Sequence, residues 1–301
     1  MKKTEPFDAI IIGGSYAGLS AAMALGRSLR QVLIIDSGDP CNKQTPHSHN
    51  FLTQDGKTPM EISTLAKQQL GHYPTVHFHQ GFAEGASGSS GAFQVGTSTG
   101  EAFGAKKMIL ASGIRDLMPE IEGFAECWGT SVIHCPYCHG YEFRDRATGI
   151  MATGEKAYHL ASLVHNLTKE LTLFMDRDAV TAEQAQKLRG HAIRFEPRKI
   201  VALEHEGGKL KRVLFGDGDG IELEALYAGL PFEQHSLLPF DLGCGFTEAG
   251  HIQVDMLQRT TVEGIYACGD NSSPMRSLAQ AIHAGNMAGA ALNRELALED
   301  F

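Results

Sequence analysis

The sequence has few cysteines and no excess of basic charge. Its 301 residues include six cysteines, too few for the disulfide framework of a small secreted protein. The 26 basic residues are outnumbered by 35 acidic ones, and the formal net charge is -9. DNA and RNA require a basic protein surface, so we expect no nucleic-acid partner. With 43% hydrophobic and 20% charged residues, the composition is that of an ordinary globular protein.

The sequence also lacks an uninterrupted apolar segment of membrane-spanning length. The stretch between Asp8 and Arg27 carries no charge, but Gly13, Gly14 and Gly18 interrupt it. A buried strand, a tight turn and a helix explain this stretch better than a bilayer or a signal peptide does. We therefore expect no membrane partner and a cytoplasmic protein whose thiols are mostly reduced.

The N-terminal residues predict a strand, a turn, a helix and a second strand. Residues 9–12 and 32–35 are continuous apolar runs, which are typical of buried parallel strands. Residues 13–18 predict the turn, and residues 19–28 predict the helix. The second strand ends in Asp36. Together these residues have the length of one βαβ unit.

The predicted turn carries a dinucleotide-binding pattern. Small residues let the backbone turn tightly and approach a pyrophosphate at a helix N-terminus, and the turn supplies Gly13, Gly14, Ser15 and Gly18 for this role. Asp36 stands at the end of the second strand, where a carboxylate accepts hydrogen bonds from ribose hydroxyls. Ser15 replaces the middle glycine of the usual G-x-G-x-x-G motif. A purely structural turn is the alternative.

A weaker copy of this unit begins near the middle of the chain. In the copy, Ala152, Gly154 and Ala157 stand at the positions of Gly13, Ser15 and Gly18. Two such units predict an α/β fold with two Rossmann-like, three-layer domains.

Cys135 and Cys138 form a Cys-x-x-Cys pair flanked by His134 and His139. Such a pair can cycle between dithiol and disulfide when one thiolate is made reactive by its surroundings. Half of a zinc site is the alternative, but zinc normally takes a second pair at similar spacing. We predict a redox pair and no metal. The other cysteines are scattered singly and are expected to pack in the interior: Cys41, Cys127, Cys244 and Cys268.

A third motif lies near the C-terminus. Residues 264–271 form an apolar strand that stops at a glycine and presents Asp270, and residues 279–285 begin a helix of small residues. Taken alone, this pattern does not separate a functional turn from a generic one.

Together the three motifs resemble the low-molecular-weight thioredoxin reductase family over nearly the whole chain. The resemblance implies that the first and third motifs bind FAD and that the cysteine pair lies in an inserted nucleotide domain. We therefore expect an FAD-binding domain of residues 1–115 and 236–301, and an inserted NAD(P)-type domain of residues 116–235 that carries the pair.

The resemblance also assigns roles to residues. Cys138 is expected to face the flavin, and Cys135 to exchange with the substrate. His139 stands where the family has an acid, and because histidine titrates near neutrality we expect it to transfer a proton. A hydrogen bond in the adjoining turn is its alternative role. The expected FAD-binding residues are Gly13, Gly14, Ser15, Gly18, Asp36, Asn50, Gly113, Asp270, Gln280 and Ala281.

The second unit departs from the family at its nucleotide site. The family motif G-x-G-x-x-A begins here with Ala152 instead of glycine. After the next strand, the family has a His-Arg-Arg cluster that binds the 2′-phosphate of NADPH, but this chain has Asp176, Arg177 and Asp178. An aspartate there disfavours a 2′-phosphate and suits a ribose hydroxyl. We predict a degraded NADPH site, which leaves the use of NAD(P)H open.

We predict an FAD-dependent thiol–disulfide oxidoreductase that passes two electrons between the flavin and the cysteine pair. Its partner is a thioredoxin-like protein or a small dithiol or disulfide, and the family resemblance implies a homodimer. The Cys-Pro-Tyr-Cys-His-Gly sequence also resembles a branch that includes dithiol oxidases. An ordinary NAD(P)H-dependent reductase and a flavin-bearing redox sensor are the alternatives. His47 and His49, just before Asn50, are secondary candidates.

Overall fold

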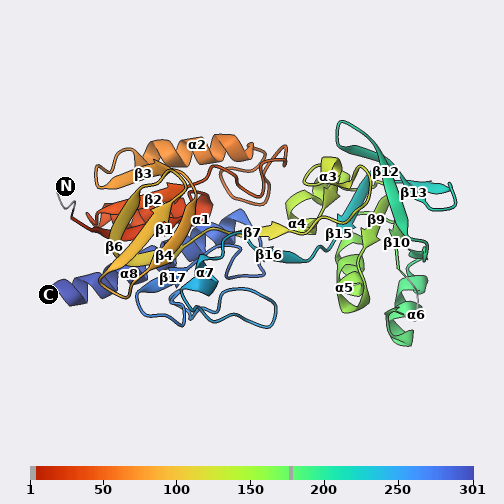
Figure 1. Cartoon of the computed structure of the whole chain (residues 1–301). Coiled ribbons are helices and arrows are strands. Elements are labelled where there is room, and N and C mark those ends of the chain that lie inside the picture. The colour runs from red at the N-terminus through yellow and green to blue at the C-terminus, as the bar shows by residue number, and fades with distance from the viewer. Residues whose placement is uncertain (1–4, 176–178) are drawn as a thin grey trace. The chain divides into compact units, whose positions relative to one another are not determined.

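The computed structural model describes residues 5–175 and 179–301 (Figure 1). Asp176, Arg177 and Asp178, on which part of the NADPH prediction rests, lie outside these residues. The chain forms two compact units. The first consists of Met1–Lys43, Met60–Arg115 and Phe232–Phe301, and the second of Gln44–Pro59 and Asp116–Pro231. This division differs from the predicted domains mainly at residues 44–59, which belong to the second unit.

The first unit is built on a mixed sheet with a parallel core. In spatial order the strands are β3 (Val76–Gln80), β2 (Val32–Asp36), β1 (Phe7–Ile12), β6 (Ala102–Leu110), β5 (Phe93–Thr97) and β4 (Ala83–Ser87), and β17 (Ile265–Ala267) also pairs with β6. β3, β2, β1, β6 and β17 are parallel, whereas β4 and β5 form an antiparallel extension. The helices of this unit are α1 (Tyr16–Arg27), α2 (Pro59–Leu70), α7 (Leu238–Asp241) and α8 (Leu278–Asp300).

Two apolar cores cover the two faces of this sheet. One joins alternate residues of β1 and β2 to α1 and α8, and the other joins the opposite faces of these strands to β5 and to the chain around α7. Continuous apolar strands suit such burial on both sides. Close packing of α8 on α1 depends on glycine, because a Cβ on Gly289 would lie 2.5 Å from the carbonyl oxygen of Ala21.

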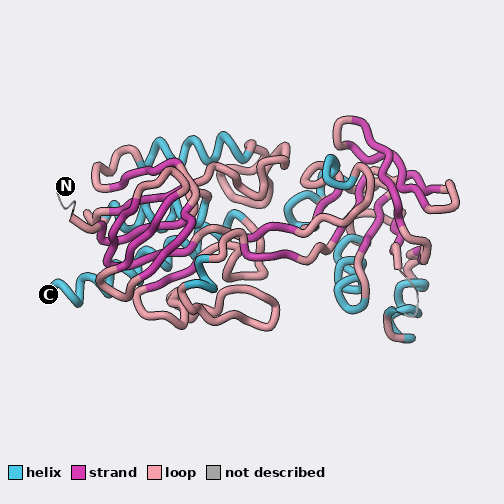
Figure 2. Tube along the Cα trace, in the orientation of Figure 1, coloured by secondary structure: helices cyan, strands magenta, loops and turns pink. Residues whose placement is uncertain are grey.

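The second unit contains a parallel sheet and a separate antiparallel sheet (Figure 2). The parallel sheet has the order β11 (Arg194–Phe195), β10 (Leu171–Leu173), β9 (Thr148–Met151), β15 (Ala225–Ala228) and β8 (Val132–Ile133). The antiparallel sheet consists of β12 (Ile200–Glu206), β13 (Lys209–Phe215) and β14 (Gly220–Glu222). The helices are α3 (Phe124–Cys127), α4 (Pro136–His139), η1 (Tyr141–Phe143), α5 (Gly154–Val164) and α6 (Ala182–Gly190).

The chain leaves the first unit through β7 (Ile114–Asp116) and returns through β16 (Phe232–Gln234), and these two strands pair with each other. The predicted α/β class with two Rossmann-like units is confirmed. Within the described residues, no helix is long and apolar enough to cross a membrane.

The structure corrects the predicted start of the first helix. α1 begins at Tyr16 rather than at Leu19, so Gly18 lies in its first turn and not in the preceding loop. A Cβ on Gly18 would lie 1.9 Å from the carbonyl oxygen of Gly13, which shows that the helix packs directly on the turn. Glycine at this position therefore serves helix packing rather than the turn itself.

Candidate active site

The glycine-rich turn of the first unit connects β1 to α1 at the carboxyl end of the parallel strands. Gly13 has a left-handed φ of +108°, and a Cβ there would lie 2.3 Å from the carbonyl oxygen of Ala111. Ser15 is the N-cap residue of α1, but its side chain makes no capping hydrogen bond. The first N–H groups of α1 are therefore not used by that side chain and suit a pyrophosphate.

Asp36 lies beside this turn, at the end of β2. Its Oδ1 accepts hydrogen bonds from the backbone N–H groups of Gly14 (3.1 Å) and Gly38 (3.3 Å), and its Oδ2 lies 3.2 Å from Lys67 Nζ. The side chain is 17% exposed. A carboxylate has about four acceptor positions, so Asp36 retains capacity for ribose hydroxyls.

The C-terminal motif approaches the same turn through Ala17. A Cβ on Gly269 would lie 3.0 Å from the Cβ of Ala17, and a Cβ on Gly285 would lie 2.0 Å from the Ala17 carbonyl oxygen. Asp270 follows Gly269, and its carboxylate lies 3.7 Å from Arg276 Nε. The two glycines thus bring the Asp270 loop and the start of α8 to the start of α1.

Gln280 and Ala281 lie in the first turn of α8, where Ser277 caps the helix by accepting a hydrogen bond from Gln280 N (3.2 Å). Gly113 has a φ of +70° and leads into β7. Next to the glycine-rich turn, Ser112 Oγ is buried and has no hydrogen-bond partner among the described residues. A buried hydroxyl usually has a partner, so the open Ser112 Oγ and the glycine cradle fit a bound dinucleotide such as FAD.

Asn50 is the predicted FAD-binding residue that belongs to the second unit. It is exposed and has a φ of +57°, and its backbone N–H donates a hydrogen bond to Asp55 Oδ1 (2.8 Å). The other predicted FAD-binding residues lie in the first unit. A cofactor role for Asn50 stays a prediction.

The thiol pair lies at the start of α4 in the second unit. Cys135 is the N-cap residue, Pro136 opens the helix, and the N–H groups of Cys138 and His139 both donate to the Cys135 carbonyl oxygen (3.3 Å each). The two Sγ atoms are 2.7 Å apart, and the cysteines are not joined in a disulfide. A disulfide requires about 2.05 Å between the sulfur atoms, so a small movement closes the bond.

His139 follows the pair directly, and its surroundings keep it neutral. Burial lowers the pKa of His139, the charge of nearby His49 lowers it further, and Glu142 partly opposes both effects. The rings of His49 and His139 lie 6.4 Å apart, edge to face. A neutral imidazole has one ring nitrogen that can accept a proton from a thiol.

The segment of residues 44–59 supplies further groups to this site. His49 Nε2 lies 3.6 Å from Glu142 Oε1, and its Nδ1 lies 3.6 Å from Asp55 Oδ1. His47 Nδ1 lies 3.0 Å from the carbonyl oxygen of Gly56, and its ring lies 6.4 Å from that of His49. Of the two secondary candidates, His49 is the one whose ring lies 6.4 Å from that of His139.

Two residues near the pair were missed by the sequence reasoning. Glu142 lies four residues after Cys138, and this helical spacing was the signal available for it. Tyr227 lies on β15; burial is the main reason that its pKa is raised, and negative charge on Cys135 and Cys138 adds to the effect. Nothing in the sequence near Tyr227 indicates that it lies close to the pair.

The turn between β9 and α5 in the second unit has a different backbone conformation from the glycine-rich turn of the first unit. Gly154, rather than Ala152, has the left-handed φ, at +59°. Glu155 lies in the first turn of α5, and its Oε2 accepts a hydrogen bond from Gln184 Nε2 (2.7 Å). A Cβ on Gly229 would lie 2.3 Å from Lys156 Cε, so the lysine side chain lies against the end of β15.

The single cysteines follow the prediction with one exception. Cys127, Cys244 and Cys268 are buried, whereas Cys41 is exposed. The prediction that Cys41 packs in the interior is wrong, because it lies in the loop after β2. Within residues 5–175 and 179–301, no group of three or more His, Cys, Asp and Glu side chains lies close enough to hold a metal ion.

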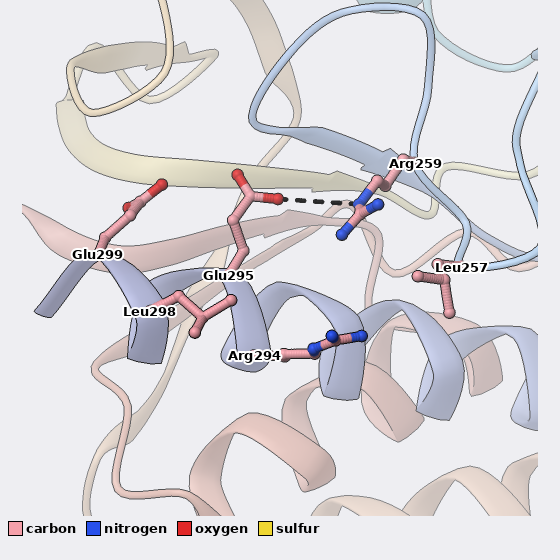
Figure 3. Close-up of a pocket in the computed structure, with 6 residues that line it drawn as sticks. All are labelled: Leu257, Arg259, Arg294, Glu295, Leu298 and Glu299. Atoms are coloured by element: carbon pink, nitrogen blue, oxygen red, sulfur yellow. Dashed lines mark ion pairs between the residues drawn. The ribbon is translucent and has the colours of Figure 1, made fainter. Parts of the chain in front are cut away.

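A pocket of about 360 Å³ lies along α8 in the first unit, away from all the residues predicted above (Figure 3). Beside it, Lys107 Nζ, fully buried, lies 2.5 Å from carboxylate oxygens of both Glu295 and Glu299. This network joins β6 to α8. The pocket is lined by Leu257, Arg259, Arg294, Glu295, Leu298 and Glu299.

Two Rossmann-type units, one of which carries a closely spaced thiol pair, define a class of nucleotide-binding disulphide oxidoreductases. The chain belongs to the pyridine nucleotide-disulphide oxidoreductase family, whose model matches residues 7–288. The predicted resemblance to thioredoxin reductases is confirmed, and the protein is an oxidoreductase. Membership of this family implies that it binds a flavin.

Similar proteins cover almost the whole chain. Thioredoxin reductase tcpT of Claviceps purpurea is 31% identical, and the match covers 98% of this chain and 96% of the relative. Thioredoxin reductase sirT of Leptosphaeria maculans is also 31% identical, with 95% and 93% covered. The solved structure of an oxidoreductase from Agrobacterium tumefaciens has a TM-score of 0.92 and 38% identity, covering 98% of this chain and 99% of that one.

Proposed function

We propose that this protein is an FAD-dependent thiol–disulfide oxidoreductase in which Cys135 and Cys138 are the redox pair. The observation that carries this proposal is the pair itself, with Sγ atoms 2.7 Å apart next to a histidine that burial keeps neutral. When bound, FAD accepts or supplies the two electrons that interconvert the dithiol and the disulfide.

Side chains of the second unit carry out the thiol–disulfide exchange and the proton transfer. Closing the disulfide joins the two sulfur atoms and releases two electrons and two protons. Neutral His139 takes one proton from a thiol of the pair, the other proton passes to solvent, and both transfers are reversed on reduction. The thiolate of Cys135 attacks the substrate disulfide and forms a mixed disulfide, which Cys138 resolves.

The residues of the first unit hold the cofactor. Gly13, Gly14, Ser15 and Gly18 let the start of α1 approach the pyrophosphate, and Asp36 binds the ribose hydroxyls. Asp270 holds the ribityl chain. By the family pattern, Gln280 and Ala281 lie at the pyrimidine end of the flavin. Gly113 and Asn50 are the remaining proposed FAD-binding residues.

The second nucleotide site is proposed to bind NADPH poorly. At the start of α5, Glu155 adds negative charge where a pyrophosphate would bind, and Lys156 lies against the end of β15. The altered backbone at Gly154 and the Cβ of Ala152 support the same conclusion. Anaerobic mixing of the oxidised protein with NADPH or NADH tests this. Rapid bleaching of the flavin by micromolar NADPH contradicts the proposal, whereas bleaching by NADH alone supports it.

The thiol partner is proposed to be a thioredoxin-type protein, because the similar curated proteins are named thioredoxin reductases. A second candidate is the oxidation of a small dithiol, with oxygen as the final electron acceptor. The differences from the family motif at the second nucleotide site favour this dithiol oxidase function, because a dithiol oxidase takes its electrons from the substrate and needs no NADPH. For either function we propose a cytoplasmic homodimer, as the family resemblance implies for the dimer.

One set of assays separates these functions. The purified flavoprotein is tested for reduction of thioredoxin with NADPH or NADH, and for oxygen consumption with small dithiols. A variant with both Cys135→Ser and Cys138→Ser should lose whichever activity is found. Cys41→Ser is the matched control, since it removes an exposed cysteine outside the pair. A flavoprotein inactive in every assay supports the redox-sensor alternative, and a protein with stoichiometric zinc and no flavin contradicts the proposal.

A further inference from the structure

Gln234 is a buried glutamine on β16, in the first unit. It is 9% exposed, and its Nε2 donates two hydrogen bonds, to the carbonyl oxygens of Gly250 (2.9 Å) and Asn271 (2.9 Å). Its Oε1 is buried without a hydrogen-bond partner among the described residues. Gln234 therefore contacts its surroundings through both amide hydrogens, and these two bonds join three separate segments of the chain.

Asn271, one of the two acceptors, directly follows Asp270 and is fully buried. Its carbonyl oxygen accepts hydrogen bonds from Gln234 Nε2 and from the backbone N–H of Ile252 (2.8 Å). Its Nδ2 donates to the carbonyl oxygen of Leu110 (2.9 Å), at the end of β6. Asn271 is thus held by bonds to β16, to the chain at Ile252 and to the central sheet.

Asp270 lies in a tight turn with Asn271. The N–H of Ser272 donates to the carbonyl oxygen of Gly269 (3.1 Å), and Gly269 has a left-handed φ of +93°. Asp270 and Asn271 are the two central residues of this turn, so the place where Asn271 is held sets the place of Asp270. The Asp270 carboxylate itself lies 3.7 Å from Arg276 Nε.

We propose that Gln234 is a positioning residue for the FAD site. By holding the Asn271 carbonyl group, it fixes the turn that presents Asp270 to the ribityl chain. Gln234 does not itself contact the cofactor. A hydrogen bond to a carboxylate depends on distance and alignment, so a displaced turn weakens it. The inference rests on the proposed function, in which Asp270 holds the ribityl chain.

The test measures FAD binding to the full-length apoprotein by flavin fluorescence. Loss of a hydrogen bond to a charged group weakens binding by about 10- to 100-fold, and we expect this for Asp270→Ala. Gln234→Met keeps the length of the side chain but removes both donors, and it should weaken FAD binding about tenfold. The double variant should bind FAD no more weakly than Asp270→Ala, because residues that act through one another are not additive.

A second readout separates positioning from loss of stability. At saturating FAD, the visible circular dichroism of the bound flavin should change in Gln234→Met in the same way as in Asp270→Ala. Ser131→Ala is the matched control. Ser131 is 2% exposed in the second unit, and its Oγ donates to the Gly208 carbonyl oxygen (2.7 Å) and accepts from Leu210 N (2.9 Å). This variant should lose stability but leave FAD affinity and the dichroism unchanged.

Gln234→Glu is a second variant of the same size, without the amide donors, and it should also weaken FAD binding. Unchanged FAD affinity in both Gln234 variants, or a loss that adds fully to that of Asp270→Ala, overturns the inference. Undiminished FAD binding by Asp270→Ala refutes the proposed role of Asp270 and the inference together. Because these measurements require no turnover, a protein that binds FAD as expected but catalyses no thiol–disulfide exchange refutes the proposed function alone.

Discussion

Replacing His49 by glutamine should shift the pH dependence of the thiol chemistry to higher pH. The charge of His49 lowers the pKa of His139, so its removal lets His139 hold a proton at higher pH. Glu142→Gln should do the opposite, since the Glu142 carboxylate raises that pKa. The two variants remove opposite charges near one imidazole, and their effects must differ in sign.

The size of the His49 effect follows from the separation of the rings. Two unit charges 6.4 Å apart interact by ~0.6 kcal/mol in water and ~2.6 kcal/mol at an effective dielectric constant of about 20. His49 is 20% exposed, which places the interaction between these limits. A shift of about half to two pKa units in His49→Gln is therefore expected.

The assay is the pH dependence of kcat/KM for thiol–disulfide turnover. Activity should fall as the pH drops through the lowered pKa of His139, because the protonated ring cannot accept a proton. His139→Gln should remove this inflection and slow turnover by about 10²- to 10⁴-fold. Folding stability should decline over the same acidic range, because the unfolded chain, in which His139 has its ordinary pKa, takes up the proton first.

Two results would refute this reasoning. One is an inflection that persists in His139→Gln, which would assign the titration to another group. The other is a shift in the same direction for His49→Gln and Glu142→Gln, which opposite charges cannot produce. Either result leaves the cysteine pair as the redox centre but removes His139 as its proton acceptor.

Three further variants test other parts of the molecule. Cys135→Ser should leave a thiolate at Cys138 and produce a long-wavelength charge-transfer band with the flavin; a band found only in Cys138→Ser reverses the two roles. Lys107→Met should cost about 1.5–3 kcal/mol in urea unfolding, because it removes charge-assisted hydrogen bonds to the partly exposed carboxylates of Glu295 and Glu299, and an unchanged or increased stability contradicts this. Gly18→Ala should release flavin on gel filtration, since its Cβ would lie 1.9 Å from a turn carbonyl, whereas Gly190→Ala, whose added Cβ has no described atom within 4 Å, should retain it.

The sequence by itself predicted the elements whose signals are local. Apolar runs predicted β1 and β2, and the small residues between them predicted the turn on which α1 begins. The weaker internal copy of this pattern predicted the second unit, and the spacing of Cys135 and Cys138 predicted a close thiol pair. Backbone preferences and side-chain periodicity act over a few neighbouring residues, so they can be recognised without the fold.

The tertiary structure alone decided which distant groups meet. It placed His49 near His139, moved residues 44–59 into the second unit, and left the Tyr227 hydroxyl without a hydrogen-bond partner among the residues that the structure describes. It also buried Lys107 against Glu295, 188 residues away in the chain. Such pairs depend on how whole sheets and helices pack, and the packing free energy is summed over residues far apart in sequence, so no local pattern specifies them.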